Sequence, residues 1–415
     1  MPKQVIFHID VNSAYLSWEA AYRLQHGAKI DLRNVPSAVG GDSATRHGII
    51  LAKSIPAKKF KIKTGETLFS ARQKCPTMII VPPNYELYMK CSNALLKLLK
   101  EYSPKIQRFS VDECFMDMTK MDKFWGPPLK VAYEIKERIK KELGFTVSIG
   151  ISTCKLLAKM ASELKKPDGV TTLFLEEIEE KMWPLPVEDL FMVGPATTKK
   201  LHSYGIHTIG ALAQTDPRFL QNRLKSHGLL IWNYANGREN SPVRENVAFE
   251  IKGIGNSTTI AFDIDNLKEA KMVLLSLVET IGGRLRKGGW AARLIAVTFK
   301  TSDFRVISHQ RKFSTPVDCT NIIYQRVEEL FSECWNGEHL RHLGVKVGEL
   351  CTNDFTQLSL FNWNQERLRK LDKTVDRIRK KYGAKALIRS SFLHSGISPL
   401  SGGIIEDYPL MSSIL

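Results

Sequence analysis

The segments VIFHID (residues 5–10) and FSVDECFMDM (residues 109–118) decide the fold of this chain and the chemistry it can support. Each is an apolar, strand-like run that carboxylates interrupt: Asp10 in the first segment, and the adjacent Asp112 and Glu113 in the second. Burying a carboxylate is costly unless a cation or hydrogen bonds compensate. Carboxylates that converge from two strands suit Mg²⁺, which prefers oxygen ligands and phosphate. Because two such ions can hold the attacking and leaving oxygens of a phosphoryl transfer, these segments predict a phosphoryl-transfer site.

The spacing of the acidic pair leaves two interpretations open. On a regular strand, Asp112 and Glu113 point to opposite faces, so they can serve one site only at a bend or a strand end. The alternative is that one of the two is a solvated turn residue, which is common for adjacent acidic residues.

The pattern around these segments predicts a ferredoxin-like layer of helices on one antiparallel sheet. Strand-like and helical runs alternate in the order β, α, β, β, α, β, at residues 4–9, 85–103, 106–118 (two strand segments), 129–143 and 145–152. The helical runs have apolar residues at a spacing of three to four. Residues 13–77 then form an insertion after the first strand.

A second βαββαβ pattern follows a polar linker and predicts a separate small domain. Residues 252–315 contain 11 Lys and Arg against 5 Asp and Glu. Several of the basic residues fall on predicted strands, which favours a phosphate-binding sheet over an ordinary solvated helix flank. They are Arg293, Lys300, Arg305, Arg311 and Lys312.

Residues 187–216 contain GPATTKKL between apolar half-helices. A glycine hairpin followed by a helix start presents backbone N–H groups to a phosphate, with Lys199 and Lys200 adding charge near Gly194. This pattern is typical of a helix-hairpin-helix element that grips the DNA backbone, although an ordinary αα-hairpin has the same pattern.

The composition favours a nucleic-acid partner. The chain has 415 residues, a formal net charge of +17 and seven scattered cysteines. A protein this basic typically binds nucleic acid or an acidic surface, although lysine and arginine can also be spread for solubility. The sequence shows no signal peptide and no membrane-spanning run, so we expect a cytoplasmic protein with reduced cysteines.

Five motifs occur together in an order that resembles the Y-family translesion DNA polymerases, specifically the DinB/UmuC group and its Gram-positive UmuC-like branch. These motifs are HIDVNSAYLSWE (8–19), AKSIPAKKF (52–60), FSVDECFMDM (109–118), GISTCKLLAKMASELKKPDG (150–169) and VGPATTKKL (193–201). The resemblance implies an α+β right-hand polymerase with a ferredoxin-like palm and a helical thumb. The implied domains are a palm (1–12 and 78–170), fingers (13–77), a thumb (171–236), a linker (237–250), a βαββαβ little finger (251–350) and a tail (351–415).

The resemblance also implies roles for individual residues. Asp10, Asp112 and Glu113 match the catalytic, metal-binding carboxylates of the family, and the Val11 carbonyl matches a further metal ligand. The implied nucleotide-binding residues are Asn12, Ser13, Ala14, Tyr15, Ser54, Lys58 and Lys166. Tyr15 falls where the family has an aromatic steric gate against the ribose 2′-hydroxyl. The residues expected to contact DNA are Lys159, Gly194, Lys199, Lys200, Arg293, Lys300, Arg305, Arg311 and Lys312.

Two departures concern the fingers. Ile55 stands where the family often has an aromatic residue, and Lys58 replaces an arginine. Lysine keeps the charge but lacks the bidentate fork of arginine, so the triphosphate contacts differ in detail.

The implied activity is template-directed, low-fidelity primer extension past damaged bases, as part of DNA repair and the SOS response. Two Mg²⁺ ions are implied, with Mn²⁺ as an alternative. The implied partners are primer–template DNA, deoxynucleoside triphosphates, the β sliding clamp and RecA or UmuD-like accessory proteins, with the chain itself a monomer. The clamp-binding peptide is QLSLF: Gln357, Leu358, Ser359, Leu360 and Phe361. The alternatives are a catalytically silent DNA- and clamp-binding factor and a nucleotidyl cyclase-like palm enzyme.

Overall fold

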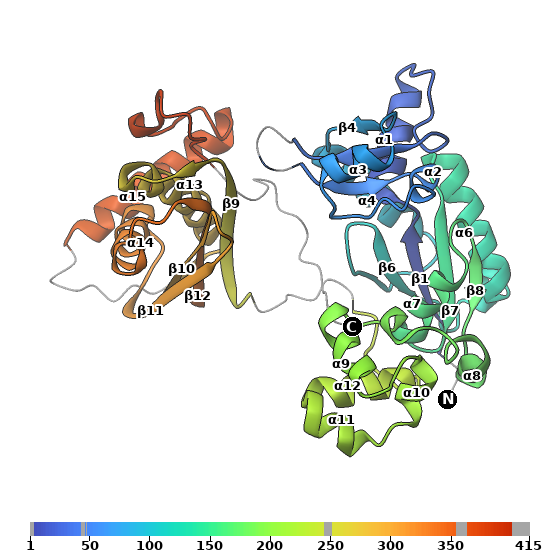
Figure 1. Ribbon diagram of the computed structural model, residues 1–415. Helices are drawn as coiled ribbons and strands as arrows, with labels where there is room; N and C mark the ends of the chain where they lie inside the picture. The colour runs from blue at the N-terminus through green and yellow to red at the C-terminus, as the bar shows by residue number, and fades with distance from the viewer. Residues whose placement is uncertain (1–3, 43–45, 47, 245–250, 354–362, 401–415) are drawn as a thin grey trace. The chain divides into compact units, whose positions relative to one another are not determined.

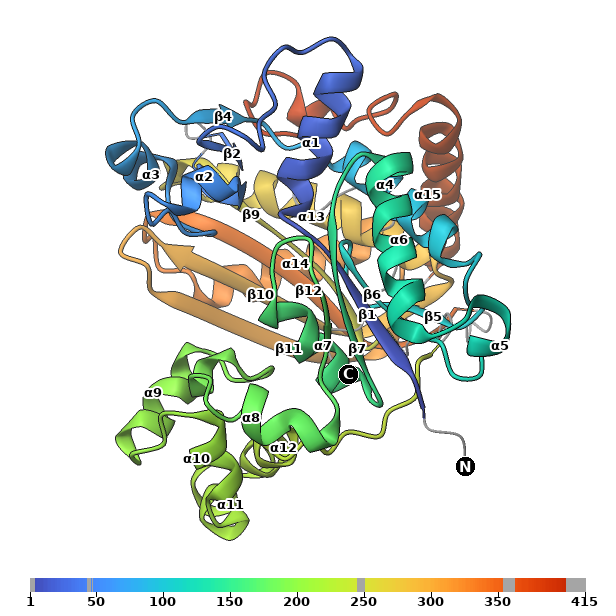
Figure 2. The same cartoon turned by 90° about the vertical axis from the view of Figure 1, so that its right-hand side faces the viewer.

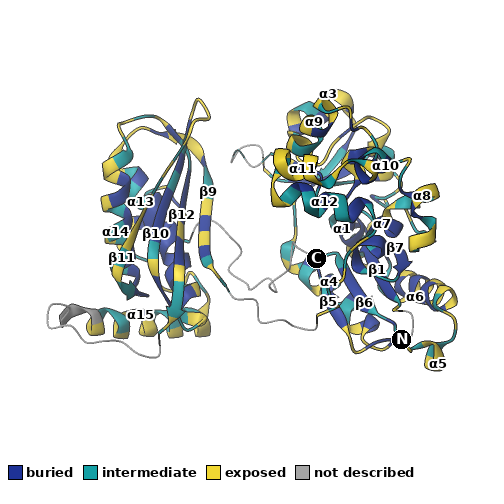
Figure 3. Ribbon diagram, turned by 90° about the horizontal axis from the view of Figure 1, so that it is seen from below, coloured by how far each residue is buried: buried dark blue, intermediate teal, exposed yellow. Residues whose placement is uncertain are grey.

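The computed structural model describes residues 4–42, 46, 48–244, 251–353 and 363–400. These residues form two compact units (Figure 1). The first holds the described residues up to 244, apart from a short segment at 42–48, and the second holds that segment and the described residues from 251 onward. Each unit has its own apolar core, and the buried residues concentrate on its strands and inner helix faces (Figure 3).

A five-stranded sheet with the order β5-β6-β1-β7-β8 organises the first unit. Its strands are β1 (Ile6–Val11), β5 (Ile106–Arg108), β6 (Glu113–Asp117), β7 (Val147–Ser152) and β8 (Val170–Thr172). Strand β1 is buried along its whole length because both faces of the sheet are covered. Phe7, Ile9 and Val11 join a core with helices α1, α4 and α6, whereas α7 packs on the opposite face (Figure 2). This arrangement confirms the ferredoxin-like order predicted from the sequence.

The helices of this sheet layer are α1 (Ala14–Gln25), α4 (Tyr85–Leu99), α5 (Asp122–Trp125), α6 (Pro128–Leu143) and α7 (Lys155–Leu164). Close packing of α7 depends on Gly150 in β7, because a Cβ at this position would lie 1.9 Å from the backbone oxygen of Ala158. The helix therefore approaches the sheet more closely than it could if residue 150 had a side chain.

A smaller sheet with the order β3-β2-β4 lies in the predicted fingers. It consists of β2 (Ser37–Gly40), β3 (Ile50–Lys53) and β4 (Ile79–Val81), accompanied by α2 (Ile55–Lys58) and α3 (Leu68–Lys74). Two boundaries from the sequence need correction. Strand β4 pairs with β2, although we expected it in the palm. Helix α1, which we expected in the fingers, packs through Leu16 and Trp18 into the core of the large sheet.

The predicted thumb is helical and packs against α7 through a third core. Its elements are α8 (Ile178–Lys181), the 3₁₀ turns at Leu175–Glu177 and Val187–Asp189, α9 (Pro195–Ser203), α10 (Ile209–Gln214), α11 (Pro217–Leu224) and α12 (Ser226–Ala235). The segment GPATTKK is itself the start of α9, with Gly194 at its N-cap, and the run before it is a 3₁₀ turn instead of the expected half-helix.

The second unit has the predicted βαββαβ order, with a four-stranded sheet arranged β11-β10-β12-β9. Its elements are β9 (Gly253–Ile264), α13 (Leu267–Lys287), β10 (Trp290–Thr301), β11 (Val306–Val317), α14 (Thr320–Cys334) and β12 (Leu340–Thr352). Val297, Phe299 and Leu343 join α13 and α14 in the core. Because side chains alternate along a strand, Thr298 and Lys300 face the other, open side of this sheet.

Helix α15 (Trp363–Tyr382) and residues 383–400, including a 3₁₀ turn at Ser390–Phe392, are also attached to this unit. Phe392 and Ile397 are buried in its core, and the Ser276 hydroxyl donates to the Ser398 carbonyl. The last thirty residues have weak periodicity and many Ser and Gly, which predicts little order. This prediction is wrong for the part of them that the structure describes. None of the helices in the described ranges is long and apolar enough to cross a lipid bilayer.

Candidate active site

The register of two neighbouring strands brings the predicted carboxylates together. Asp10 on β1 lies directly opposite Glu113, the first residue of β6. Asp112 precedes this strand in a turn, where the Ser110 hydroxyl donates to its carboxylate at 2.5 Å and accepts from the Glu113 backbone N–H at 3.0 Å. The acidic pair therefore lies at a strand end, which is the condition under which both residues can serve one site.

Asp10 is almost completely buried, with 7% of its surface exposed, and it pairs with Lys166. The Lys166 Nζ lies 3.0 Å from Asp10 Oδ1 and 2.6 Å from Glu163. Burial raises the pKa of Asp10, Lys166 opposes this shift and the neighbouring Glu113 adds to it, with a resulting pKa of about 8. A buried carboxylate with this pKa needs more positive charge than one lysine supplies.

Glu113 is held by a lysine and a histidine. Its Oε2 lies 2.7 Å from the Nζ of Lys159 and 3.6 Å from the Nε2 of His8. Burial opposes ionisation, but the interactions with His8 and Lys159 are stronger and lower the pKa of Glu113 below its ordinary value. Lys159 also lies over the rings of Phe109 and Phe191, so the lysine that we expected at DNA is directed to Glu113.

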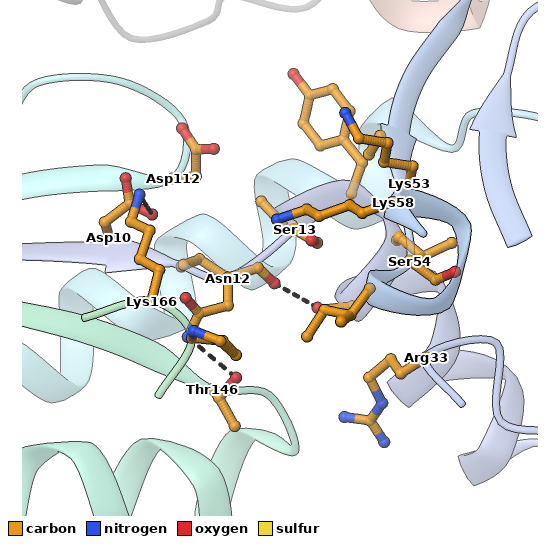
Figure 4. Close-up of a pocket in the computed structure, with 18 of the residues that line it drawn as sticks. Asp10, Asn12, Ser13, Arg33, Lys53, Ser54, Lys58, Asp112, Thr146 and Lys166 are labelled. Carbon is orange, nitrogen blue, oxygen red and sulfur yellow. Dashed lines mark hydrogen bonds and ion pairs between the residues drawn. The ribbon is translucent and has the colours of Figure 1, made fainter. Parts of the chain in front are cut away.

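A cavity of about 650 Å³ opens beside these carboxylates. In Figure 4, Lys166 reaches toward Asp10 from one side, and Lys53 and Lys58 enter from the fingers. Predicted site residues that line it are Asp10, Val11, Asn12, Ser13, Ala14, Tyr15, Ser54, Lys58, Asp112 and Lys166. Glu113 instead lines a small adjoining pocket together with Asp112.

The N-terminus of α1 forms one wall of this cavity. Ser13, the N-cap residue, has a φ of +49°, which is a strained conformation for a residue other than glycine, and its side chain makes no capping hydrogen bond. The first N–H groups of a helix have no partner inside it. Together with the helix dipole, these groups make the segment from Ser13 to Tyr15 suitable for an anion.

Tyr15 is held by stacking. Its ring lies parallel to that of Tyr88, with centroids 4.4 Å apart, and edge-on to that of Tyr85. Burial raises the pKa of Tyr15, and the charge of Asp112 raises it further. The ring therefore has a fixed position on the side of the cavity near Asp112.

Sequence reasoning missed several residues of the cavity wall: Arg33, Asn34, Lys53, Thr146 and Asp168. Lys53 lies one residue before the predicted Ser54, within the motif AKSIPAKKF, so this motif could have identified it. Burial lowers the pKa of Lys53, and the positive charge of Lys58 lowers it further. The two lysines therefore lie near one another in the cavity wall. Ser54 has an internal role as well, because its hydroxyl donates to the Val35 carbonyl and caps α2.

The predicted DNA-binding residues fall into distinct groups. Gly194, Lys199 and Lys200 are exposed on α9. In the second unit, the strand register puts Lys300 and Lys312 on the open face of the sheet, together with the exposed Lys346, which sequence reasoning missed.

Three other basic residues do not fit a single basic face. Arg311 lies on the helix side, where it pairs with Glu333 of α14 at 2.6 Å, so a common face for Arg311 and Lys312 is a wrong expectation. Arg305 lies in the β10–β11 hairpin paired with Asp303, and Arg293 is exposed beside an irregularity in the β10–β11 register.

Two further expectations concern the clamp-binding peptide and the metal ions. The peptide from Gln357 to Phe361 lies outside the described residues. Among the residues that are described, no group of three or more His, Cys, Asp or Glu side chains is arranged to hold a metal ion.

Three family models match this chain. The impB/mucB/samB family model matches residues 9–163, the model of that family's C-terminal domain matches residues 251–360, and the IMS family HHH motif matches residues 176–206. The last match covers Gly194 and the start of α9, where the sequence predicted a helix-hairpin-helix element.

Full-length relatives are also similar. DNA polymerase IV of Clostridium acetobutylicum is 48% identical over 391 residues, which are 94% of this chain and 98% of that protein. DNA polymerase IV of Acetivibrio thermocellus is 39% identical over 94% of this chain and 98% of that protein. DNA polymerase IV 1 of Bacillus subtilis is 35% identical over 96% and 95%. A solved Y-family DNA polymerase chimera of Dbh and Dpo4 has a TM-score of 0.70 at 21% identity, covering 84% of this chain and 100% of that chain.

Proposed function

The chain belongs to the Y-family of DNA-directed DNA polymerases, and from this premise we propose that it extends primers past damaged template bases by two-metal-ion nucleotidyl transfer. The observation that carries this proposal is the meeting of Asp10 and Asp112 at one cavity, with Glu113 adjoining through the β1–β6 register. Anionic groups at one end and cations from the fingers at the other suit a triphosphate with bound divalent cations.

The residues fit such cations. Asp10 and Asp112 offer carboxylate oxygens and Val11 a carbonyl at the same cavity wall, which are the hard ligands that Mg²⁺ prefers. Asp10 retains an elevated pKa despite Lys166, so the site favours more positive charge. Bound by Asp10, Asp112, Glu113 and the Val11 carbonyl, two Mg²⁺ ions would lower the pKa of the primer 3′-hydroxyl and neutralise the triphosphate.

The protein's own contribution is to position the nucleotide. Lys53 and Lys58 provide positive charge to the phosphates from the fingers, and the first N–H groups of α1 can donate to phosphate oxygens. Lys166 lies within reach of the same region and can exchange Asp10 for a phosphate oxygen. This positioning, with fixed charges around the transferred group, accounts for most of the catalysis that phosphoryl transfer needs.

Tyr15 selects the sugar in this proposal. A ring stacked on Tyr88 cannot retreat, so a ribose with an additional 2′-oxygen would collide with it. Discrimination thus comes from a rigid wall instead of from a hydrogen bond.

DNA is held by backbone contacts. Exposed Lys199 and Lys200 follow the N-terminus of α9, and the open sheet face of the second unit carries Lys300, Lys312 and Lys346. Such contacts hold a duplex independently of its sequence and weaken as salt rises. Sliding-clamp docking through QLSLF, and association with RecA or UmuD-like proteins, remain part of the proposal.

Primer extension tests this function. We expect Asp112→Asn to reduce single-nucleotide incorporation by at least 10³-fold while the Kd for primer–template DNA changes less than threefold, because the carboxylate serves the reaction and not duplex binding. Asp117→Asn, at the far end of the strand that follows Asp112 and outside the cavity lining, is the matched control and should stay within threefold of the parent. Parental rates in Asp112→Asn, or a parent chain that binds DNA without extending primers in Mg²⁺, would contradict the proposal.

A further inference from the structure

The charges of helix α15 are sorted onto two faces. Asp372 and Asp376 both point to Arg286 on α13, at 3.2 and 2.6 Å. On the same side, Arg379 pairs with the buried Glu279 of α13 at 2.7 Å, and Arg369 pairs with Asp318 at 2.8 Å. These ion pairs attach one face of α15 to the second unit and use both aspartates of the helix.

The other face of α15 is exposed and nearly uniformly basic. Its cations are Arg367, Lys370, Lys373, Arg377, Lys380 and Lys381. The one acidic residue on it is Glu366, which pairs with Lys370 at 2.9 Å. Because the two aspartates are turned inward and are balanced there by Arg369 and Arg379, the net positive charge of the helix lies on its outward face.

We propose that this outward face of α15 is an additional DNA-contact surface that binds the phosphate backbone of a duplex. The inference rests on the proposed function, because the DNA is the polymerase's own primer–template. The family's C-terminal domain model ends at residue 360, before this helix begins. Nothing in the proposed site for catalysis or in the open sheet face requires these cations.

The chemistry of the face favours DNA over a protein partner. Protein interfaces have an apolar centre from which charged residues are depleted. Helical spacing instead puts Thr374 among the cations, and the exposed Leu371 and Tyr382 fall to one side of them. A polyanion with regularly spaced charges matches this surface. At a rise of about 1.5 Å per residue, the six cations extend over roughly 20 Å, so several can reach phosphates of one duplex.

The test is a salt titration of DNA binding with the full chain. The variant carries Arg367→Gln, Lys373→Gln, Arg377→Gln and Lys380→Gln. These changes leave the inward ion pairs intact, and glutamine has a helix propensity close to that of lysine and arginine. A 30-base-pair primer–template is titrated between 50 and 300 mM salt without clamp. We expect at least tenfold weaker binding near 150 mM, with a slope of log K against log[salt] reduced by about 2 to 4, because each lost phosphate contact removes about 0.9.

The matched control removes four exposed lysines from α6, α4 and the C-cap of α4 in the first unit, as Lys97→Gln, Lys100→Gln, Lys130→Gln and Lys141→Gln. It has the same net charge as the α15 variant and should change the slope by less than 1. A second control keeps the charge, with lysine and arginine exchanged at the four α15 positions, and should bind like the parent.

Three results would overturn the inference. The first is an unchanged slope and Kd in the α15 glutamine variant, and the second is an equal loss of binding in both fourfold glutamine variants. The third is a loss of binding in the charge-retaining variant, which would mean that helix structure and not charge is responsible. Normal DNA binding with lost stimulation by the sliding clamp would assign the face to a protein partner instead. Because the titration needs no catalysis, its result is independent of whether the parent extends primers.

Discussion

Gly150→Ala should disturb the packing of the palm more than the replacement of any other described glycine by alanine. At no other described glycine would the new Cβ lie so close to a neighbouring atom. The added Cβ would lie 1.9 Å from the backbone oxygen of Ala158 and 2.5 Å from the backbone nitrogen of Ser162. Real Cβ atoms stay at least 3.0 Å from such neighbours. Because backbone atoms cannot rotate away as a side chain can, α7 must retreat from β7 by about 1 Å.

The expected losses of stability and activity follow from the contacts that α7 and its Lys159 make. Overpacking costs about 1–3 kcal/mol, and the rigid contact puts this case near 3. In a unit of this size, about 1 kcal/mol lowers Tm by roughly 2–4 °C, so the transition of the first unit should fall by about 6–12 °C. The same movement takes Lys159 away from Glu113, and a misplacement of about 1 Å can reduce catalysis by about 10²-fold.

The assay combines calorimetry with single-nucleotide incorporation at a temperature where the variant is folded. Gly283→Ala on α13 is the control, because the nearest atom to its Cβ would be Asp376 Oδ1 at 4.0 Å. Replacing a helical glycine should stabilise the second unit by about 0.5–1 kcal/mol. A Gly150→Ala variant that melts within 1 °C of the parent and incorporates nucleotides normally would refute the close-packing argument.

Three further predictions follow from described or predicted residues. Tyr15→Ala should raise the ratio of ribonucleotide to deoxynucleotide incorporation by at least tenfold, and an unchanged ratio in single-turnover assays would exclude the gate. Arg286→Met should destabilise the second unit by about 3 kcal/mol, because it leaves the buried Asp372 uncompensated; thermal unfolding measures this loss, and adding Asp372→Asn should restore part of it. Replacing Leu360 and Phe361 with alanine should remove clamp stimulation at unchanged basal activity, and equal clamp capture by variant and parent would reject the docking peptide.

Periodicity made much of the fold predictable. The apolar run before Asp10 and the amphipathic run at 85–103 each have one dominant pattern, and β1 and α4 form there. Periodicity does not state which sheet a short strand joins. The three residues of β4 read equally well as palm or fingers, and only their pairing with β2 decides.

Site residues were predictable where a sequence motif specifies them. They were not predictable where packing between distant elements determines the partner of a side chain. Asp10 and Asp112 share a cavity as expected, since a strand end allows both to face it. The partner of Lys159 depends on how α7 packs over β7 and β1, next to β6, which no local pattern encodes. Alternation along β11 should have separated Arg311 from Lys312, and applying it strictly would have avoided that error.

The burial of Phe392 and Ile397 has a practical consequence for work with shortened chains. A fragment that stops at residue 360, where the family's domain model ends, would lose both side chains and leave their apolar neighbours on α13 and α14 in water. Each buried side chain of this size contributes about 1.5–3 kcal/mol, so the truncated fragment would fold less stably and would aggregate more readily. A shortened form of the second unit should therefore keep the residues through 400.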